Sequence, residues 1–254
     1  MKIKKIEMEL SDKNIREKEF HNKLQSSSKG RFENVFYKAI SNAWNDFFYH
    51  LNQNVKGSEI LDYGCGVGPI IEKVINYNPK KITGIDISDV SIEKAKNKFK
   101  NTKIEVELLV DNCEKTKFSN EKFDLVYGLG ILHHLQLSKC IDEISRILKP
   151  KGSLLFIEPL GTNPIINLYR KLTPKSRSDD EHPLLEKDFL LLNERFTDVE
   201  IKYYGLLTVV FFPFYRNPKK SFLFNILKRL DQFLFKVKIM RSLAWSVLIL
   251  AKKS

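Results

Sequence analysis

The segment "ILDYGCGVGPI", residues 60–70, constrains the fold most strongly, because Gly64, Gly66 and Gly68 follow an apolar run directly. Glycine has no Cβ, so its backbone can approach a ligand closely and adopt positive φ angles. A strand, a glycine turn and a helix in this order form the nucleotide-binding crevice at the carboxyl ends of a parallel sheet. The segment therefore predicts such a crevice, and the competing interpretation is an ordinary tight turn.

Strand and helix patterns alternate along the middle of the chain. We expect strands at 59–64, 81–88, 104–111, 123–130 and 153–159, and helices at 69–77, 91–100 and 137–148. A helical period runs through residues 12–50, and 196–205 and 243–252 have the patterns of two further strands. Strands that alternate with helices predict an α/β fold with a parallel sheet covered on both faces.

The spacing of the glycines limits the kind of ligand. A dinucleotide fingerprint requires G-x-G-x-x-G, but the third glycine comes one place early and Pro69 occupies its position. A phosphate-binding G-K-[ST] motif is absent. We therefore expect a nucleoside without a phosphate chain, and Asp62, just before the turn, is placed to pair with a cation on it.

Acidic residues also end the next two expected strands. Asp86 lies in "GIDIS", about 18 residues beyond Gly68, where an acid accepts hydrogen bonds from ribose hydroxyls. Asp111 ends the third strand, where a carboxylate is placed to accept from the exocyclic amine of adenine. The alternative for Asp111 is a plain turn residue, and Ser88 or Asp89 is the expected helix N-cap.

Five segments, "ILDYGCGVGP", "GIDIS", "DNCEKTKF", "FDLVYGLGILHHL" and "LKPKGSLLFIEP", occur in an order and spacing that resemble class I S-adenosylmethionine-dependent methyltransferases. The resemblance covers about residues 55–160. It implies a Rossmann-like, doubly wound, seven-stranded sheet of order 3-2-1-4-5-7-6 with strand 7 antiparallel, and S-adenosylmethionine as the cofactor. The domain would be single, with a helical lid over 1–55, a cofactor-binding core over 56–160 and a substrate-side region over 161–254.

The resemblance also assigns cofactor contacts. It places the three glycines at the methionine moiety and the backbone of Leu129 and Gly130 at the amino-acid end, and Asp62 is a further candidate contact of the cofactor. Asp86 would hold the ribose, Ile87 beside it is a further candidate cofactor contact, and Asp111 with Asn112 or Cys113 would face adenine. The stretch from Asp111 to Phe118 is one residue longer than is usual in the family, which affects the adenine contact.

Catalysis by such a protein requires few specific residues, because the sulfonium already activates the methyl group. The enzyme aligns a nucleophile with the methyl–sulfur bond and excludes water, and a base helps when the acceptor is a hydroxyl. The candidates are His133 and His134 after the fourth strand, with structural roles as the alternative, and the polar stretch 173–184, with a solvated loop as the alternative. That stretch offers Arg177, Asp180, Glu181 and His182. A [DN]-P-P-[YFW] motif is absent after the fourth strand, which argues against methylation of exocyclic amines in nucleic acid.

Composition points to a globular protein of the cytoplasm. Of 254 residues, 43% are apolar and 29% are charged, which suits a chain with a buried core. The charged N-terminal stretch argues against a secretory signal, and the longest apolar runs are too short to span a membrane. Three widely spaced cysteines favour a reducing compartment, and we expect no metal site.

The net charge of +12 is concentrated near the end of the chain, where residues 202–254 carry eleven basic residues against one acidic residue. An insert, 206–242, separates the last two expected strands and contains a basic amphipathic helix. Its predicted apolar arc comprises Phe222, Leu223, Ile226, Leu227, Leu230, Phe233, Leu234 and Val237, with Phe224 and Phe235 outside it. The arc suits packing on the protein's own sheet, a homodimer face or a membrane interface. Nucleic acid is disfavoured, because the aromatic residues do not alternate with the basic ones.

Three functions remain open from the sequence. The first is a methyltransferase acting on an O, N or C atom of a small, largely hydrophobic acceptor, such as a quinone precursor, a lipid or a polyketide-like metabolite, in the cytoplasm or at the inner face of the membrane. The second is an RNA or protein methyltransferase that uses the basic C-terminal segment. The third is a non-catalytic relative that binds the cofactor.

Overall fold

The computed structural model describes residues 9–26, 35–173, 178, 180–215 and 217–254. Its centre is a sheet of seven strands in the order β3-β2-β1-β4-β5-β7-β6, in which β7 is antiparallel to both of its neighbours. The strands are β1 Glu59–Tyr63, β2 Lys81–Asp86, β3 Glu105–Val110, β4 Phe123–Leu129, β5 Leu148–Pro159, β6 Thr197–Tyr204 and β7 Ser246–Lys252. The predicted fold class and strand order are therefore confirmed.

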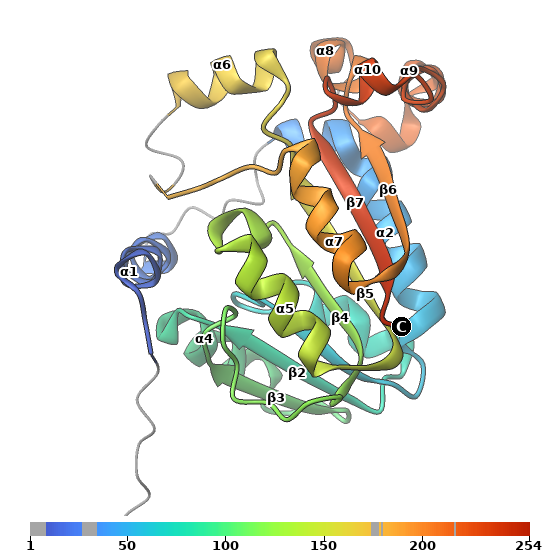
Figure 1. The fold of residues 1–254 in the computed structure, drawn as a ribbon. Coiled ribbons are helices and arrows are strands. Elements are labelled where there is room, and N and C mark those ends of the chain that lie inside the picture. Colours follow the sequence, from blue (N-terminus) through green and yellow to red (C-terminus); the bar gives the residue numbers. More distant parts are fainter. Residues whose placement is uncertain (1–8, 27–34, 174–177, 179, 216) are drawn as a thin grey trace, which may run out of the picture.

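Helices cover both faces of the sheet (Figure 1). On one face lie α5 Leu137–Ile147 and α7 Phe189–Arg195, whose apolar residues join one core cluster. On the other face lie α2 Ser41–Val55, α3 Ile71–Val74 and α4 Asp89–Phe99, which build a second cluster. Because both faces are covered, successive residues of a central strand are buried without alternation, as in Leu154, Leu155, Phe156 and Ile157 of β5.

Local sequence accounts for the boundaries of these elements. The Ser88 hydroxyl accepts a hydrogen bond from the Ser91 N–H at 3.0 Å, so the predicted N-cap of α4 is confirmed. The predicted helix at 69–77 is shorter than expected: α3 gives way to a 3-10 turn, Ile75–Tyr77, and Asn78 then adopts a φ of 55°. Strand β5 begins at Leu148, five residues before the expected strand at 153.

The N-terminal helices have different roles. α2, with the preceding 3-10 turn Val35–Ile40, contributes Phe47 and Leu51 to the core and packs on the sheet. α1 Asp12–Ser26 lies apart from the sheet on the side of α4 (Figure 1). Its two buried residues in the described part are polar, Asn14 and Glu17. α1 therefore contributes no apolar side chain to either core cluster in its described part.

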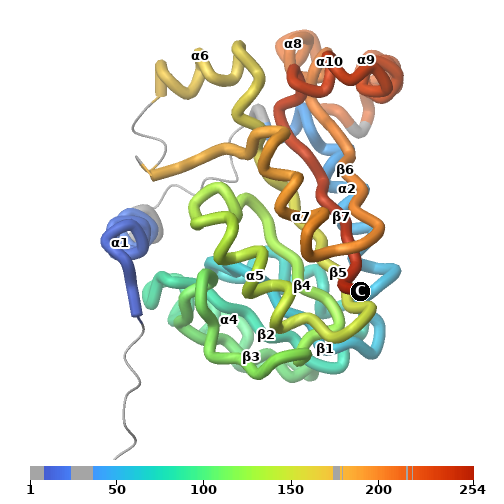
Figure 2. The backbone as a smooth tube through the Cα atoms, viewed as in Figure 1, coloured from blue at the N-terminus to red at the C-terminus, as the bar shows by residue number. Residues whose placement is uncertain are grey.

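Helical segments fill the chain between the neighbouring strands β6 and β7, as predicted. They are α8 Leu207–Val210, the 3-10 turns Phe212–Phe214 and Pro218–Lys220, α9 Phe222–Leu234 and α10 Lys238–Arg241. The backbone trace in Figure 2 shows them gathered at one end of the molecule, where α6 Pro164–Leu172 also lies.

α9 packs on the protein through a face that overlaps the predicted apolar arc only in part, and most of the arc faces outward. Phe224 in α9 and Phe235 just after its end fall outside the predicted apolar arc, yet they are only 4% and 6% exposed. Phe222, which belongs to the arc, is 80% exposed. Asp231 explains this orientation of α9 about its axis. Its buried carboxylate accepts hydrogen bonds from the N–H groups of Leu206, Leu207 and Thr208 at the start of α8. A buried carboxylate needs these donors, so Asp231 turns inward and most of the apolar arc turns outward.

No helix in the described ranges is long and apolar enough to cross a membrane.

Candidate functional site

The three glycines of the turn after β1 serve different purposes. A Cβ on Gly64 would lie 2.6 Å from the Ile131 side chain, and a Cβ on Gly68 would lie 2.3 Å from the Phe99 ring. These two glycines therefore allow the protein to pack against its own turn. Gly66 has a φ of 53°, and nothing lies within 4 Å of the place where its Cβ would be. Gly66 therefore leaves open space above its backbone, which we call the open floor of the turn, where a ligand can bind.

A pocket opens over this turn. It is lined by Asp62, Gly64, Cys65, Gly66, Val67, Pro69, Ile70 and Leu129. The structure thus brings together four predicted cofactor contacts, Asp62, Gly64, Gly66 and Leu129, from the ends of β1 and β4. These assignments remain predictions, and the pocket gives them a common location.

Asp62 is the most unusual group in the pocket. Its side chain is 2% exposed, and its Oδ2 and the hydroxyl of Tyr127 have no hydrogen-bond partner of good geometry among the described residues. Burial raises the pKa of Asp62 to about 8, although the nearby Tyr127 hydroxyl lowers it. The negative charge of Asp86 raises the pKa further. A buried acid in this state gains most from a ligand cation, which would supply the missing partner.

Asp86 connects the turn to β2. Its two oxygens accept hydrogen bonds from the N–H groups of Gly66 and Ser88, each at 2.8 Å. Burial raises the pKa of Asp86, although both of these N–H groups lower it. Each oxygen retains a second lone pair, which suits the predicted contact with ribose hydroxyls. Ile87 follows at the half-buried start of the next turn.

The predicted adenine group follows β3 and is engaged within the protein. Asp111 accepts from the N–H groups of Asn112 and Lys117 at 3.0 and 3.1 Å. The Asn112 amide donates to the Glu9 carbonyl at 3.1 Å. The Cys113 side chain is buried in the core, and burial raises the pKa of its thiol. Adenine contacts for these residues stay predictions.

His133 is held by a residue that the sequence reasoning did not single out. Its Nδ1 lies 2.7 Å from Oε2 of Glu158, a fully buried acid at the end of β5. Burial raises the pKa of Glu158 to about 7, although the N–H groups of Leu132 and Ile131, each 2.8 Å from Oε1, lower it. Glu158 therefore fixes the turn Leu132–His134 and orients the His133 imidazole.

His134 forms a polar cluster with α1. Its Nδ1 lies 3.0 Å from Oε2 of Glu17, and the same oxygen lies 3.5 Å from Nε2 of His21. Burial and the neighbouring His133 lower the pKa of His134 to about 4, so its ring is neutral at neutral pH. The ligand-type atoms of Glu17, His21 and His134 lie within 4.8 Å of one another, and these are described residues that can hold a metal ion.

Further hydrogen bonds hold α1 against the segments that follow β2, β3 and α6. Asn22 donates to Asp89 and accepts from Ser88 after β2, and Asn14 lies against Asn112 after β3. Arg16 makes two hydrogen bonds to Asp180, at 2.7 and 2.8 Å. α1 therefore covers the edge on which the glycine turn and Asp86 lie.

His182 is separated from the other two histidine candidates by its environment. Its side chain is 60% exposed, and its Nε2 lies 3.8 Å from Asp188. Its backbone N–H nevertheless donates to the His133 carbonyl at 2.7 Å, which attaches the loop after α6 to the histidine turn. Asp180 and Glu181 of the same loop face α1 and His134, and Arg177 lies outside the described residues.

Two residues at this edge were missed from the sequence, for different reasons. Glu158 stands at the carboxyl end of a strand, in "FIEP", which is the same signal that identified Asp86 and Asp111. Glu17 lies in a helix far away in the sequence, and no local pattern connects it with His134.

The residues present fit S-adenosylmethionine. The open floor at Gly66 accommodates the methionine moiety, and the unpartnered oxygen of Asp62 suits its ammonium group. Asp86 stands one strand away, where a ribose would follow. S-adenosylmethionine bound here would supply an activated methyl group.

Comparisons with known proteins agree with this fit. Residues 60–152 match the family described as "Methyltransferase domain". An O-methyltransferase of Aspergillus nomiae is 31% identical over 157 residues, which cover 58% of this chain and 69% of that protein. A sterol 4-C-methyltransferase of Caenorhabditis elegans is 30% identical over 120 residues, 45% of this chain but only 36% of that longer protein.

A solved structure extends the likeness in fold to nearly the whole chain. The N-methyltransferase NodS from Bradyrhizobium japonicum, in complex with S-adenosyl-L-homocysteine, superposes with a TM-score of 0.62 at 17% identity. The alignment covers 93% of this chain and 97% of NodS. Together with the pocket at the glycine turn, the match to the O-methyltransferase shows that this chain belongs to the class I S-adenosylmethionine-dependent methyltransferases.

Proposed function

We propose that the protein transfers the methyl group of S-adenosylmethionine to an O, N or C atom of a small, largely apolar acceptor. The main support for S-adenosylmethionine as the methyl donor is Asp62. Its buried oxygen, which lacks a hydrogen-bond partner among the described residues, lines the pocket next to the open space at Gly66. An α-ammonium group is the natural partner for that oxygen.

Partly exposed aromatic side chains near the carboxyl edge of the sheet support an apolar acceptor. Leu129, which lines the pocket, packs against the same apolar cluster as Phe212 and Trp245. Tyr37 stacks on Trp245 with ring centroids 5.6 Å apart and remains 39% exposed. Trp245 stands at the carboxyl edge of the sheet, since its carbonyl accepts from the Leu160 N–H just after β5. The sterol and O-methyltransferase relatives are consistent with this class of acceptor.

The remaining chemistry is alignment and proton removal. A sulfonium methyl group reacts once a nucleophile is in line with the methyl–sulfur bond and water is excluded, and α1 covers the edge where this happens. If the acceptor is a hydroxyl, His133 is the better placed base of the three histidine candidates, because Glu158 fixes its ring and stabilises the cation that it forms.

Transfer of labelled methyl groups tests the proposal. The purified protein is incubated with methyl-labelled S-adenosylmethionine and, separately, with a lipid and metabolite extract, RNA, or protein from cells that lack it. We expect label in an organic-soluble small molecule, and none with Gly66→Ala, which fills the open floor. Label in RNA or protein instead would replace the proposed acceptor with the alternative, and binding without any transfer would indicate a non-catalytic relative.

A further inference from the structure

The orientation of α9 leaves apolar side chains exposed at one end of the molecule. Phe222 and Phe233 of α9 are 80% and 66% exposed, and Ile239 of α10 is 74% exposed. Phe214, in the 3-10 turn after α8, is 74% exposed.

A second helix presents a similar stripe at the same end. On α6, Ile165, Leu168 and Leu172 are between 58% and 73% exposed. Their spacing places them along one side of the helix. Figure 1 shows α6 at the end of the molecule that also carries α8, α9 and α10. We call the exposed apolar side chains of α6, of the turn Phe212–Phe214, and of α9 and α10 the docking surface.

The two halves of the docking surface are connected through Asn163. Its side-chain oxygen accepts from the N–H groups of Ile165 and Ile166 and so caps the start of α6. Its amide donates to the carbonyl of Leu243, just after α10. One buried side chain therefore ties α6 to the end of the insert.

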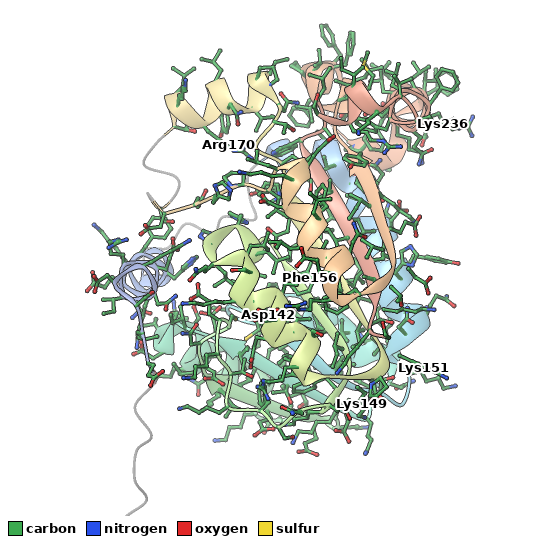
Figure 3. All side chains as sticks on the ribbon, viewed as in Figure 1. Asp142, Lys149, Lys151, Phe156, Arg170 and Lys236 are labelled. Carbon is green, nitrogen blue, oxygen red and sulfur yellow. The ribbon has the colours of Figure 1, made fainter. Side chains whose placement is uncertain are left out.

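Basic residues accompany the docking surface. Residues 206–245 contain eight Lys or Arg residues, and Asp231, the one acidic residue among them, is 1% exposed and bonded inward. The last turn of α6 adds Arg170 and Lys171. Figure 3 shows Arg170 and Lys236 at this end of the molecule.

From this arrangement we propose that the docking surface binds the anionic surface of a lipid bilayer. Exposed Phe, Leu and Ile side chains flanked by Lys and Arg match a membrane interface, where the apolar groups enter the headgroup region and the basic groups meet acidic lipids. A second copy of the chain fits less well, because a face-to-face dimer would bring two strongly basic surfaces together.

The orientation links the docking surface to the acceptor side. α6 follows β5 and α8 follows β6, so both leave the sheet at the carboxyl ends of parallel strands. The glycine turn leaves β1 at the same edge. Docking would therefore turn the covered edge of the sheet toward the lipid. Delivery of the acceptor from the bilayer rests on the proposed function, whereas docking itself does not.

Vesicle co-sedimentation of the full chain tests the docking surface directly. The vesicles contain phosphatidylcholine alone or with about a third of phosphatidylglycerol. We expect binding to the anionic vesicles that weakens as salt is added, because the basic residues are exposed and screened. No binding of the unmodified protein to anionic vesicles would overturn the proposal.

Apolar substitutions test the orientation. The double variant Phe222→Ser with Phe233→Ser should lower the vesicle partition coefficient at least about tenfold, since a fully buried Phe contributes about that factor or more. The matched control is Tyr49→Ser with Leu190→Ser, which changes two side chains that are 62% and 63% exposed on α2 and α7. Equal binding by the test variant and the control would refute the assignment.

Charge reversal tests the choice of partner. Arg229→Glu with Lys236→Glu should lower binding to anionic vesicles by about 25-fold or more, since each basic residue near such a surface contributes about fivefold. Lys96→Glu with Lys100→Glu, on exposed positions of α4 and just after it, is the control. A dimer in light scattering that the apolar variant splits, with no vesicle binding, would instead assign the surface to a second copy. S-adenosylhomocysteine binding, measured on every variant, verifies the fold and keeps this test separate from the test of methyl transfer.

Discussion

The state of Asp62 predicts that cofactor binding releases a proton. With a pKa raised to about 8 by burial, the carboxyl is about 90% protonated at pH 7. The α-ammonium group of a bound ligand favours the charged form and returns the pKa toward its ordinary range. Binding at pH 7 should therefore release about 0.9 proton per site.

The affinity should follow the same titration. If the bound form is fully ionised, the association constant rises about 50-fold between pH 6 and pH 8, because the ionised fraction of the free protein rises by that factor. Titration calorimetry with S-adenosylhomocysteine, which carries the same ammonium group, measures both quantities. The released proton appears as a difference in heat between buffers with different enthalpies of ionisation.

Asp62→Asn should abolish both effects and weaken binding by about 1.5 to 3 kcal/mol, the contribution of a hydrogen bond to a charged group. The control is Asp142→Asn, at an exposed acid that pairs with Arg195 on the surface. Equal heats in all buffers, together with an affinity that stays flat from pH 6 to pH 8, would refute the reasoning.

The same substitution should stabilise the ligand-free protein. The folded-state pKa of Asp62 lies above the unfolded value, so between about pH 4 and pH 8 the folded protein holds a proton that the unfolded chain has lost. The contribution of this group to the free energy of unfolding then falls by about 1.4 kcal/mol per pH unit. Asp62→Asn should therefore melt above the unmodified protein at pH 8, and the difference should narrow toward pH 5.

Three further predictions concern the turn, the insert and the histidine. Gly66→Ala should abolish binding of S-adenosylhomocysteine in calorimetry, while a methyl group at positive φ lowers the free energy of unfolding by only about 1 to 2 kcal/mol. Gly64→Ala should lower the melting temperature further, because its Cβ would collide with the packed Ile131 side chain. Asp231→Ala should cost about 2 to 4 kcal/mol by leaving buried N–H groups unpaired, so limited proteolysis should cleave residues 206–242 first while ligand binding persists. Glu158→Gln should change the tautomer of His133 at neutral pH, which nitrogen-15 shifts of the imidazole report; an unchanged tautomer would contradict the orienting role.

The sheet could be predicted because its information is local. Alternating strand and helix patterns specify a covered parallel sheet, and the glycine turn marks the end of β1 at which the pocket forms. Acidic residues at strand ends identified Asp86 for the same reason. Periodicity and residue type were sufficient at these places, because the central strands are buried between the same two layers of helices.

The rest depended on long-range partners. A helical wheel ranks the faces of α9 by hydrophobicity, but the face that packs was decided by Asp231 and its donors at the start of α8. The contact of Glu17 with His134 joins α1 to the turn after β4, and neither segment carries a sign of the other. Such contacts follow from the folded arrangement and not from the pattern of either segment.

The polar character of α1 has a consequence for turnover. Its contacts across the strand ends are hydrogen bonds and ion pairs, such as Arg16 with Asp180 and Asn22 with Asp89, which water can replace at a net cost of about 1 kcal/mol each. Detachment of α1 is therefore cheap compared with opening the sheet, and helix motions of this kind take microseconds to milliseconds. Transient detachment of α1 would let S-adenosylhomocysteine leave and S-adenosylmethionine bind while the seven-stranded sheet stays intact.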